Sequence, residues 1–355
     1  MSELLLDQAQ AVRPGEELNI EQLQPWLNEY IGDLKGTPEV TQYSGGVSNW
    51  TYCLAFDNRS LILRRGPDGT KAKGAHDMQR EHDLQRDLKR VFAAVPHVYG
   101  YCADETVIGS DFYVMEKLEG IIPRKNLPKS LHLAQDDVRT LCTNAIDTLI
   151  DLHQVDYKSA GLEHIGKGAG YTGRQIEGWI NRYMRAKTWN VPRAKKVTQW
   201  LQASIPASEN LCITHNDFRF DNLVLDVQHP TNIIGVLDWE LATIGDPLMD
   251  LGNTLAYWIQ ADDDKLMQST RKQPTHLNGM MTRCEVVKYY CEKTGLDAND
   301  FAFYEVYGLF RLAAIAQQIY YRYHHKQTRN PAYKYYWFFV NYLIRRCKKI
   351  IKTAG

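Results

Sequence analysis

Two neighbouring stretches of the 355-residue chain are the most informative about its fold and chemistry: ITHNDFRFDN at residues 213–222 and GVLDWE at residues 235–240. Each begins as a short apolar run and continues into polar side chains, so the polar groups are expected to project from strand ends into a cleft. Asp217 and Asn222 have the Asp-x-x-x-x-Asn spacing, and Asp238 follows the second apolar run. Phosphoryl transfer needs such a set. One carboxylate orients a hydroxyl and accepts its proton, while an amide oxygen and a second carboxylate hold Mg²⁺ on a triphosphate.

The same residue types also occur for structural reasons alone. An Asp or Asn beside a strand is most often a turn residue, and each of the three residues taken singly has that interpretation. Their joint occurrence, with an apolar strand before each element, favours catalysis over turn formation. The sequence therefore predicts a phosphate-transferring site at two strand ends.

The part of the chain before these stretches has the pattern of a sheet. Apolar and aromatic residues at 51–56 and 61–63, separated by DNRS, predict a β-hairpin. A helix is expected near 75–90. Two further short strands are expected around 106–108 and 112–115, with Gly and Ser between them.

The part that follows a connector at 116–123 is mainly helical by its period. Apolar residues repeat at helical spacing over 138–150, and residues 280–352 keep the same period almost throughout. Asp246 and Pro247 predict the first turn of another helix, with Asp as its N-cap and Pro at the first helical position.

These patterns predict an α+β chain of two lobes: a small sheet-rich lobe over residues 1–117 and a large, mainly helical lobe over residues 118–355. Lys and Arg number 42 and so do Asp and Glu, so the chain lacks the net charge typical of nucleic-acid or membrane-surface binding. The seven cysteines form no C-x-x-C pair, which argues against a zinc site and for a reducing, cytoplasmic location. No apolar stretch is long enough to predict a membrane span.

The motifs resemble those of the aminoglycoside phosphotransferase and choline kinase-like family, which has the protein-kinase-like fold. The resemblance is closest to the branch associated with acyl-CoA dehydrogenases, whose motifs typically read H-G-D-[YF]-R-x-D-N and V-L-D-W-E, then G-D-P-x-x-D-L. This chain has HNDFRFDN at 215–222, VLDWE at 236–240 and GDPLMDL at 245–251. Asn216 stands where the branch usually has Gly, a mild departure because Asn tolerates unusual backbone angles.

The resemblance implies a role for each polar residue of the two stretches. Asp217 is expected to be the catalytic base, and Asn222 and Asp238 are expected to be the metal ligands. His215 is expected to brace the loop backbone. Arg219 stands where related kinases place a group that faces the γ-phosphate; its alternative interpretation is an ordinary surface Arg.

A glycine pair before the predicted hairpin is the second region to which the resemblance gives a role. Gly45, Gly46, Ser48 and Asn49 lie between two expected strands. Such a pair alone is most often only a turn. In kinase-like folds, however, the loop at this place covers the phosphates with backbone N–H groups, and Gly lets the backbone approach closely.

The third region is the strand that ends in Arg64, where most kinases have Lys. The resemblance implies that Arg64 holds the phosphates and pairs with Glu81 of the following helix, because guanidinium is suited to carboxylate and phosphate together. Arg65 is the alternative phosphate ligand. The other interpretation is an edge-strand Arg with an unrelated surface Glu. Farther along, backbone groups of Glu116 and Leu118 resemble the hinge that hydrogen-bonds adenine.

Taken together, the sequence predicts an ATP-dependent, Mg²⁺-dependent phosphotransferase that acts on a hydroxyl of a small molecule, with GTP as an alternative donor. The acyl-CoA-dehydrogenase-associated branch points to a hydroxyacyl thioester or another small alcohol as the acceptor. Two other functions stay open: a nucleotide-binding scaffold that has lost transfer, and a metal-dependent phosphohydrolase. Nothing in the sequence selects an oligomeric state.

Overall fold

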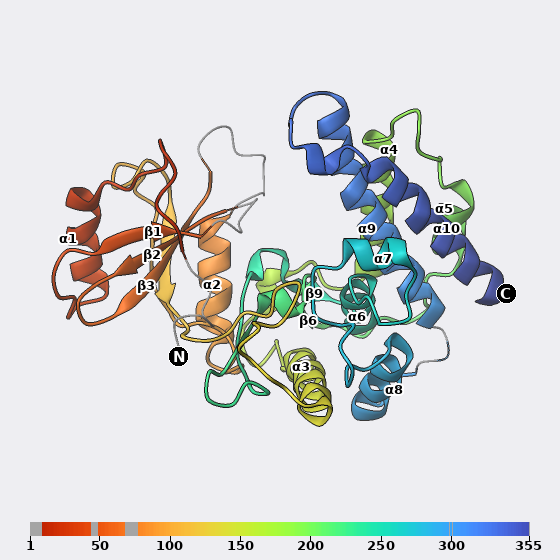
Figure 1. Ribbon diagram of the computed structural model, residues 1–355, viewed down its shortest axis with the longest axis horizontal. Coiled ribbons are helices and arrows are strands. Elements are labelled where there is room, and N and C mark those ends of the chain that lie inside the picture. The colour runs from red at the N-terminus through yellow and green to blue at the C-terminus, as the bar shows by residue number, and fades with distance from the viewer. Residues whose placement is uncertain (1–8, 44–48, 68–76, 298, 300, 355) are drawn as a thin grey trace.

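A computed structural model describes most of the chain and divides visibly into a sheet-rich part and a larger helical part (Figure 1). The described residues are 9–43, 49–67, 77–297, 299 and 301–354.

The N-terminal part is built on a five-stranded sheet in the order β1-β2-β3-β5-β4, with every neighbouring pair antiparallel. Strands β2 and β3 form the hairpin that the sequence predicted around DNRS. The strands are β1 Glu39–Gln42, β2 Trp50–Ala55, β3 Ser60–Arg65, β4 Val98–Cys102 and β5 Phe112–Glu116.

One predicted strand is wrong. Residues 106–108 form a turn, and the strand that pairs with β5 is β4, at 98–102. The Asp104 carboxylate accepts hydrogen bonds from the backbone nitrogen of Thr106 at 2.9 Å and from its hydroxyl at 2.6 Å. A short polar side chain that bonds the backbone two residues on favours a turn over a strand, whatever the β propensity of the residues that follow.

Two helices cover opposite faces of this sheet (Figure 1). On one face, α1 (Ile20–Tyr30) buries Leu23 and Leu27 against alternate residues of the strands, among them Leu54 and Leu63. On the other face, α2 (Met78–Leu88) buries Met78 against Ile62 and Met115. The period of two along each strand places its apolar residues on both faces, so both must be covered.

Helix α2 also joins the second part of the molecule. Leu84 and Leu88 at its C-terminal end belong to the same apolar core as Leu141 and Leu149 of α3 (Gln135–Gln154). The Arg80 guanidinium donates to backbone oxygens of Glu240 and Ala242. The helix is therefore fixed to both parts of the chain.

The C-terminal part is mainly helical, with two small antiparallel strand pairs, β6–β9 and β7–β8, in its middle. As predicted, α6 begins at Pro247 with the Asp246 carboxylate accepting from the first-turn backbone N–H groups. The helices are α4 Tyr171–Arg185, α5 Lys195–Ala203, α6 Pro247–Ala256, α7 Lys265–Thr270, α8 Arg283–Thr294, α9 Phe301–His324 and α10 Tyr336–Ala354, and the strands are β6 Cys212–Thr214, β7 Leu223–Leu225, β8 Ile233–Val236 and β9 Thr243–Gly245. Short 3₁₀ turns are η1 Glu163–Ile165, η2 Phe220–Asn222, η3 Trp239–Leu241 and η4 Pro331–Tyr333.

The connector after β5 lies directly against the β7–β8 pair. Ile121 and Leu225 exchange backbone hydrogen bonds of 2.8 Å in both directions. A Cβ at Gly120 would meet the Val224 side chain, so only glycine lets the connector approach this closely. The expected division at residues 117 and 118 falls within this connector and stays a prediction.

Candidate active site

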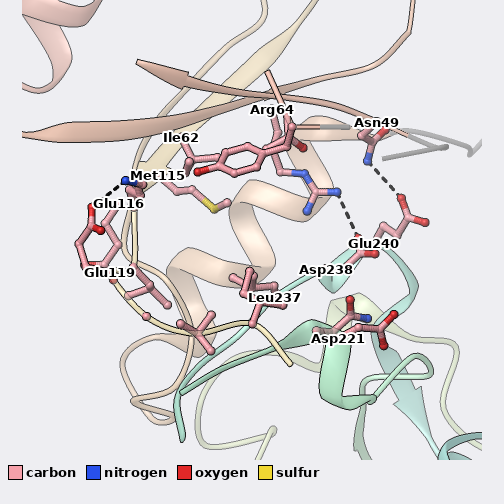
Figure 2. A pocket seen from close by; sticks show the side chains of 18 of the residues that line it. Asn49, Ile62, Arg64, Met115, Glu116, Glu119, Asp221, Leu237, Asp238 and Glu240 are labelled. Carbon is pink, nitrogen blue, oxygen red and sulfur yellow. Dashed lines mark hydrogen bonds and ion pairs between the residues drawn. The ribbon is translucent and has the colours of Figure 1, made fainter. Parts of the chain in front are cut away.

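A pocket of about 220 Å³ lies between the N-terminal sheet and the middle of the C-terminal part (Figure 2). One wall comes from β2, β3 and β5, another from the connector, and the floor from the segments around the two motifs quoted first. Its lining includes Asn49, Ile62, Arg64, Met115, Glu116, Leu118, Asp221, Asn222, Leu237, Asp238 and Glu240.

Arg64 crosses the pocket from the sheet to the floor. Its Nη1 lies 2.8 Å from Glu81 Oε1. Its Nη2 lies 3.2 Å from Asp238 Oδ1 (Figure 2). The Tyr113 hydroxyl donates to the same Glu81 oxygen at 2.9 Å. Arg65 points elsewhere: it donates to the Ile108 backbone oxygen at 2.9 Å. The structure thus brings Arg64 and Glu81 together, and the role of Arg64 toward phosphate stays a prediction.

Burial and neighbouring charges shift the pKa values of both Arg64 and Glu81. Burial raises the pKa of Glu81, and the neighbouring Arg64 opposes that rise. Burial disfavours the charged Arg64, but Glu81, Tyr113 and Asp238 outweigh it and raise the pKa of Arg64 well above its usual value. The Arg64 guanidinium, held by two carboxylates from different parts of the chain, is therefore permanently charged.

The loop after β6 holds the expected base and its neighbours within contact. The Asn222 Nδ2 donates to the Asp217 backbone oxygen at 2.9 Å and to Asp217 Oδ2 at 3.2 Å. Arg219 Nη2 lies 3.3 Å from that same carboxylate oxygen, and the guanidinium lies over the Tyr257 ring at 4.9 Å. With 19% of its side chain exposed, Arg219 is no ordinary surface Arg.

The charged side chains around Asp217 affect the pKa of the neighbouring Tyr257. Burial raises the pKa of Tyr257, Asp217 adds to the rise, and Arg311 and Arg219 oppose it. Arg311 also bonds the residue before Asp217, because its Nη2 donates to the Asn216 backbone oxygen at 2.9 Å. Sequence analysis did not single out Arg311, which lies on α9.

Asp250 of α6 anchors the backbone of the loop. Its two carboxylate oxygens accept from the backbone nitrogens of His215 at 2.6 Å and of Asn216 at 2.8 Å. His153 Nε2 lies 3.1 Å from the same carboxylate. Burial alone would raise the pKa of Asp250, but these bonds and the nearby histidines lower it. The GDPLMDL motif contained this residue, although its role was not inferred.

His215 braces the loop, as expected. The Asp217 backbone N–H donates to His215 Nδ1 at 3.2 Å, which leaves the proton of the neutral ring on Nε2. The Nε2 atom then donates to the Leu237 backbone oxygen at 3.0 Å. The ring therefore links the segment of Asp217 to the strand end that carries Asp238.

A second contact crosses the pocket beside the first. The Asn49 amide donates to Glu240 Oε2 at 3.1 Å (Figure 2). Burial raises the pKa of Glu240 to about 7, with the neighbouring Asp238 adding to the rise. Glu240 was quoted in the VLDWE motif without a role. Gly45, Gly46 and Ser48, which were predicted to cover the phosphates, lie outside the described residues.

The segment predicted to hold adenine lies at the far end of the pocket. The Glu116 backbone N–H donates to the His97 oxygen at 2.8 Å, and its carboxylate accepts from the His97 nitrogen at 2.6 Å. The Leu118 side chain packs against Gly235. Adenine recognition by this segment stays a prediction.

A match to a family model places the chain among known proteins. The model of the phosphotransferase enzyme family matches residues 39–279, which include the pocket and both motifs. The chain belongs to the phosphotransferase enzyme family.

A curated relative of this phosphotransferase is acyl-CoA dehydrogenase family member 11 from Rattus norvegicus, 33% identical over 323 residues. The match covers 88% of this chain but 40% of that relative, so the chain spans less than half of the relative's length.

Solved structures show the same fold. A candidate aminoglycoside phosphotransferase from Ralstonia eutropha has a TM-score of 0.81 and 26% identity, covering 96% of this chain and 100% of its own. Choline kinase from Cryptosporidium parvum has a TM-score of 0.66 and 13% identity, covering 94% and 97%. Aminoglycoside phosphotransferase APH(4)-Ia, in ternary complex with AMP-PNP and hygromycin B, has a TM-score of 0.57 and 14% identity. The match covers 94% of this chain and 98% of that one. The kinase-like fold that the resemblance implied is therefore confirmed.

The donor atoms at the pocket floor fit Mg²⁺. Asp238 supplies a carboxylate, and Asn222, whose amide nitrogen is used by Asp217, supplies a carbonyl oxygen. Within the described ranges no group of three or more His, Cys, Asp or Glu could hold a metal. Two oxygen ligands are nevertheless what Mg²⁺ typically takes from a protein, since waters and substrate phosphates complete its shell. In the part of the chain that the structure describes, no helix has the length and apolarity to cross a membrane.

Proposed function

We propose that this chain transfers the γ-phosphate of ATP to a hydroxyl group of a small molecule. The observation that carries the proposal is the Asp217 carboxylate, held by Asn222 and Arg219 beside a pocket whose opposite wall is formed by Arg64. A carboxylate positioned in this way can accept the proton of an attacking hydroxyl. The AMP-PNP complex of APH(4)-Ia supports ATP as the donor, with GTP as the alternative.

Each residue of the set has a distinct task in this function. Asp217 orients the acceptor hydroxyl and takes its proton. Arg219, next to that carboxylate, stabilises negative charge on the transferred phosphoryl group. Arg64 exchanges its contact with Asp238 for the phosphate oxygens of the nucleotide, while Glu81 keeps its other edge in place. Mg²⁺ bound at Asn222 and Asp238 would neutralise charge on the triphosphate.

The charges around Asp217 are of both signs and do not select the charge of the acceptor. Arg219 lies 3.3 Å from Asp217 and 3.2 Å from Asp221, and the buried Arg311 donates to the Asn216 backbone oxygen. In the acidic run at 262–264, two of the three carboxylates already have partners: Asp263 pairs with Arg283 at 2.6 Å, and Asp264 caps α7. A hydroxyacyl thioester is the acceptor class that we propose, and the name of the acyl-CoA dehydrogenase relative supports it.

The proposed location is the cytoplasm. All seven cysteines are unpaired, and six of them are buried. Free buried thiols are typical of proteins in reducing compartments.

ADP release tests the proposed function. Purified protein with Mg·ATP would be given a hydroxyacyl-CoA, the free hydroxy acid and kanamycin, each against a sample without acceptor. We expect ADP release to rise with the hydroxyacyl thioester and to stay at background with kanamycin. Asp217→Asn should abolish the rise. Asp226→Asn, at a half-buried Asp that follows β7, is the matched control and should keep it.

The two alternatives give different results in the same assay. A phosphohydrolase would release ADP and phosphate equally with and without acceptor. A nucleotide-binding scaffold would show ATP-dependent thermal stabilisation with no ADP release under any condition. Either pattern, obtained with a full panel of hydroxylated acceptors, would overturn the transferase proposal.

A further inference from the structure

Asn216, the residue before the expected base, has an unusual backbone. Its φ is 63°, in the left-handed region that non-glycine residues rarely adopt. It is 7% exposed and lies between His215 and Asp217, whose backbone and side chains form the loop described above. A left-handed residue at this place decides the direction in which the chain enters Asp217.

Every polar atom of Asn216 is used. The backbone nitrogen donates to Asp250, and the backbone oxygen accepts from Arg311 Nη2 at 2.9 Å. The side-chain oxygen accepts from the Tyr171 hydroxyl at 3.1 Å and from Asn253 Nδ2 at 3.1 Å. The side-chain nitrogen donates to Thr214 Oγ1 at 2.9 Å and to the Leu241 oxygen at 3.1 Å.

These six partners come from five parts of the chain. Tyr171 begins α4, Asp250 and Asn253 lie on α6, Arg311 lies on α9, Thr214 ends β6, and Leu241 ends the turn η3 that follows Asp238. The amide accepts two bonds and donates two, which is its full capacity. A glycine at 216 would adopt the same φ without strain, but it would make none of the four side-chain bonds.

Arg311 adds a cation to the same peptide. Its side chain is 4% exposed, and its guanidinium lies over the Trp179 ring at 5.2 Å while it donates to the Asn216 oxygen. The peptide that joins Asn216 to Asp217 is therefore held at its carbonyl by a buried charge-assisted bond, which is stronger than a neutral one.

We propose that Asn216 is a positioning residue for Asp217: its side-chain amide and the Arg311 bond at its carbonyl fix the loop so that the carboxylate faces the acceptor. The proposal rests on the proposed role of Asp217 as the base. The alternative is that Asn216 serves only to allow the left-handed backbone and to stabilise the fold.

Two variants separate these possibilities. Asn216→Gly keeps the left-handed backbone and loses the side-chain bonds, whereas Asn216→Ala loses the bonds and adds backbone strain. Gln317→Ala is the matched control. Gln317 is likewise fully buried, lies on α9 and donates two bonds, to Ala186 and Thr188, away from the loop.

Hydrogen exchange of the intact chain gives a readout that needs no substrate. In Asn216→Gly the backbone amides of 215–222 should exchange at least about tenfold faster, while those of 309–320 stay as in the unchanged protein. Gln317→Ala should do the reverse. Unchanged exchange of 215–222 in Asn216→Gly would overturn the proposal. If Asn216→Gly fails to fold, the conservative Arg311→Lys is measured in its place, and faster exchange of 215–222 is again the expected result.

Turnover gives the second readout. With Mg·ATP and the acceptor found by ADP release, Asn216→Gly should lower kcat at least about tenfold while the KM for ATP changes less than about twofold. Full activity in Asn216→Gly with loss only in Asn216→Ala would show that the backbone angle alone matters, and would also overturn the proposal. Absence of any ATP turnover in the unchanged protein would refute the proposed function, while the exchange result would still decide the role of Asn216.

Discussion

The two sides of the pocket are held in different ways. On the sheet side, Arg64 is fixed by side chains alone, shared between Glu81 and Asp238. On the loop side, the Asp217 carboxylate also meets the side chains of Asn222 and Arg219. In addition, the backbone of the loop is bonded to Asp250 and to the His215 ring. A shared guanidinium can change partners when a phosphate arrives, whereas a loop bonded through its peptides keeps its shape. We infer that the sheet side adapts to the nucleotide and the loop side is preorganised.

The largest effect is expected on the preorganised side. Asp217→Asn should lower transfer by roughly 10²-fold or more, because the amide cannot accept the proton. In the proposed function Asp217 meets only the acceptor, so the variant should keep its thermal stabilisation by Mg·ATP. Asp238→Asn should also lose transfer, together with the Mg²⁺-dependent part of that stabilisation. Melting temperatures with ATP, with and without Mg²⁺, check both variants, and the opposite assignment of effects would reverse the two roles.

The sequence predicts those residues of the two sides that are close together along the chain, and it does not predict contacts between residues far apart in sequence. Asp217, Asn222 and Asp238 were predicted together because their spacing is local and each follows an apolar run. The contacts that hold them were not predicted. Asp250 lies on α6, and Arg311 reaches the loop from α9 across 95 positions of sequence. No periodicity marks such a contact, because any buried Arg on a helix has the same pattern in the sequence.

The fold shows the same limit. The hairpin and the cap at Asp246 were predicted because hydrophobic alternation and Asp-Pro act over a few residues. The strand expected at 106–108 was wrong because the bonds of Asp104 outweigh propensity there. The place of Arg64 opposite Asp238 depends on how the sheet meets the helical part, which the sequence pattern alone does not define.

A second test concerns the anchor of the loop. Asp250→Ala should lower the free energy of unfolding by about 3–5 kcal/mol, because it leaves the N–H groups of His215 and Asn216 and the ring of His153 without their partner. Urea unfolding followed by circular dichroism measures the loss. A change below about 1 kcal/mol would contradict the view that Asp250 holds the loop.

A substitution on the sheet side should lower the free energy of unfolding by less than Asp250→Ala does. Glu81→Ala removes one partner of Arg64, yet Asp238 remains as a second, so we expect a loss of about 1–3 kcal/mol, less than at Asp250. Transfer should weaken as well, because the guanidinium is no longer held in place for the phosphates. Glu292→Ala, which removes the exposed partner of Lys288 on α8, is the control. Normal stability, ATP affinity and turnover in Glu81→Ala would show that the Arg64–Glu81 pair contributes neither to the fold nor to transfer.

The smallest effect calibrates what an exposed ion pair contributes away from the pocket. The pKa of Glu285 is lowered to about 2, first by the backbone N–H of Thr282, which it caps, and next by Arg139 at 2.7 Å. A lowered carboxyl pKa contributes stability that is complete above the unfolded value and is lost as the pH falls from about 4.5 toward 2.

Glu285→Gln keeps an acceptor for the cap and removes the charge. Because the pair is about half exposed, solvent screening limits the difference at pH 7 to about 0.2–1 kcal/mol. Unfolding by urea at pH 7 and near pH 3 should show that difference shrinking at the lower pH. A difference that stays constant would mean that Glu285 acts only through its cap, and the comparison of the two sides of the pocket would then rest on buried pairs alone.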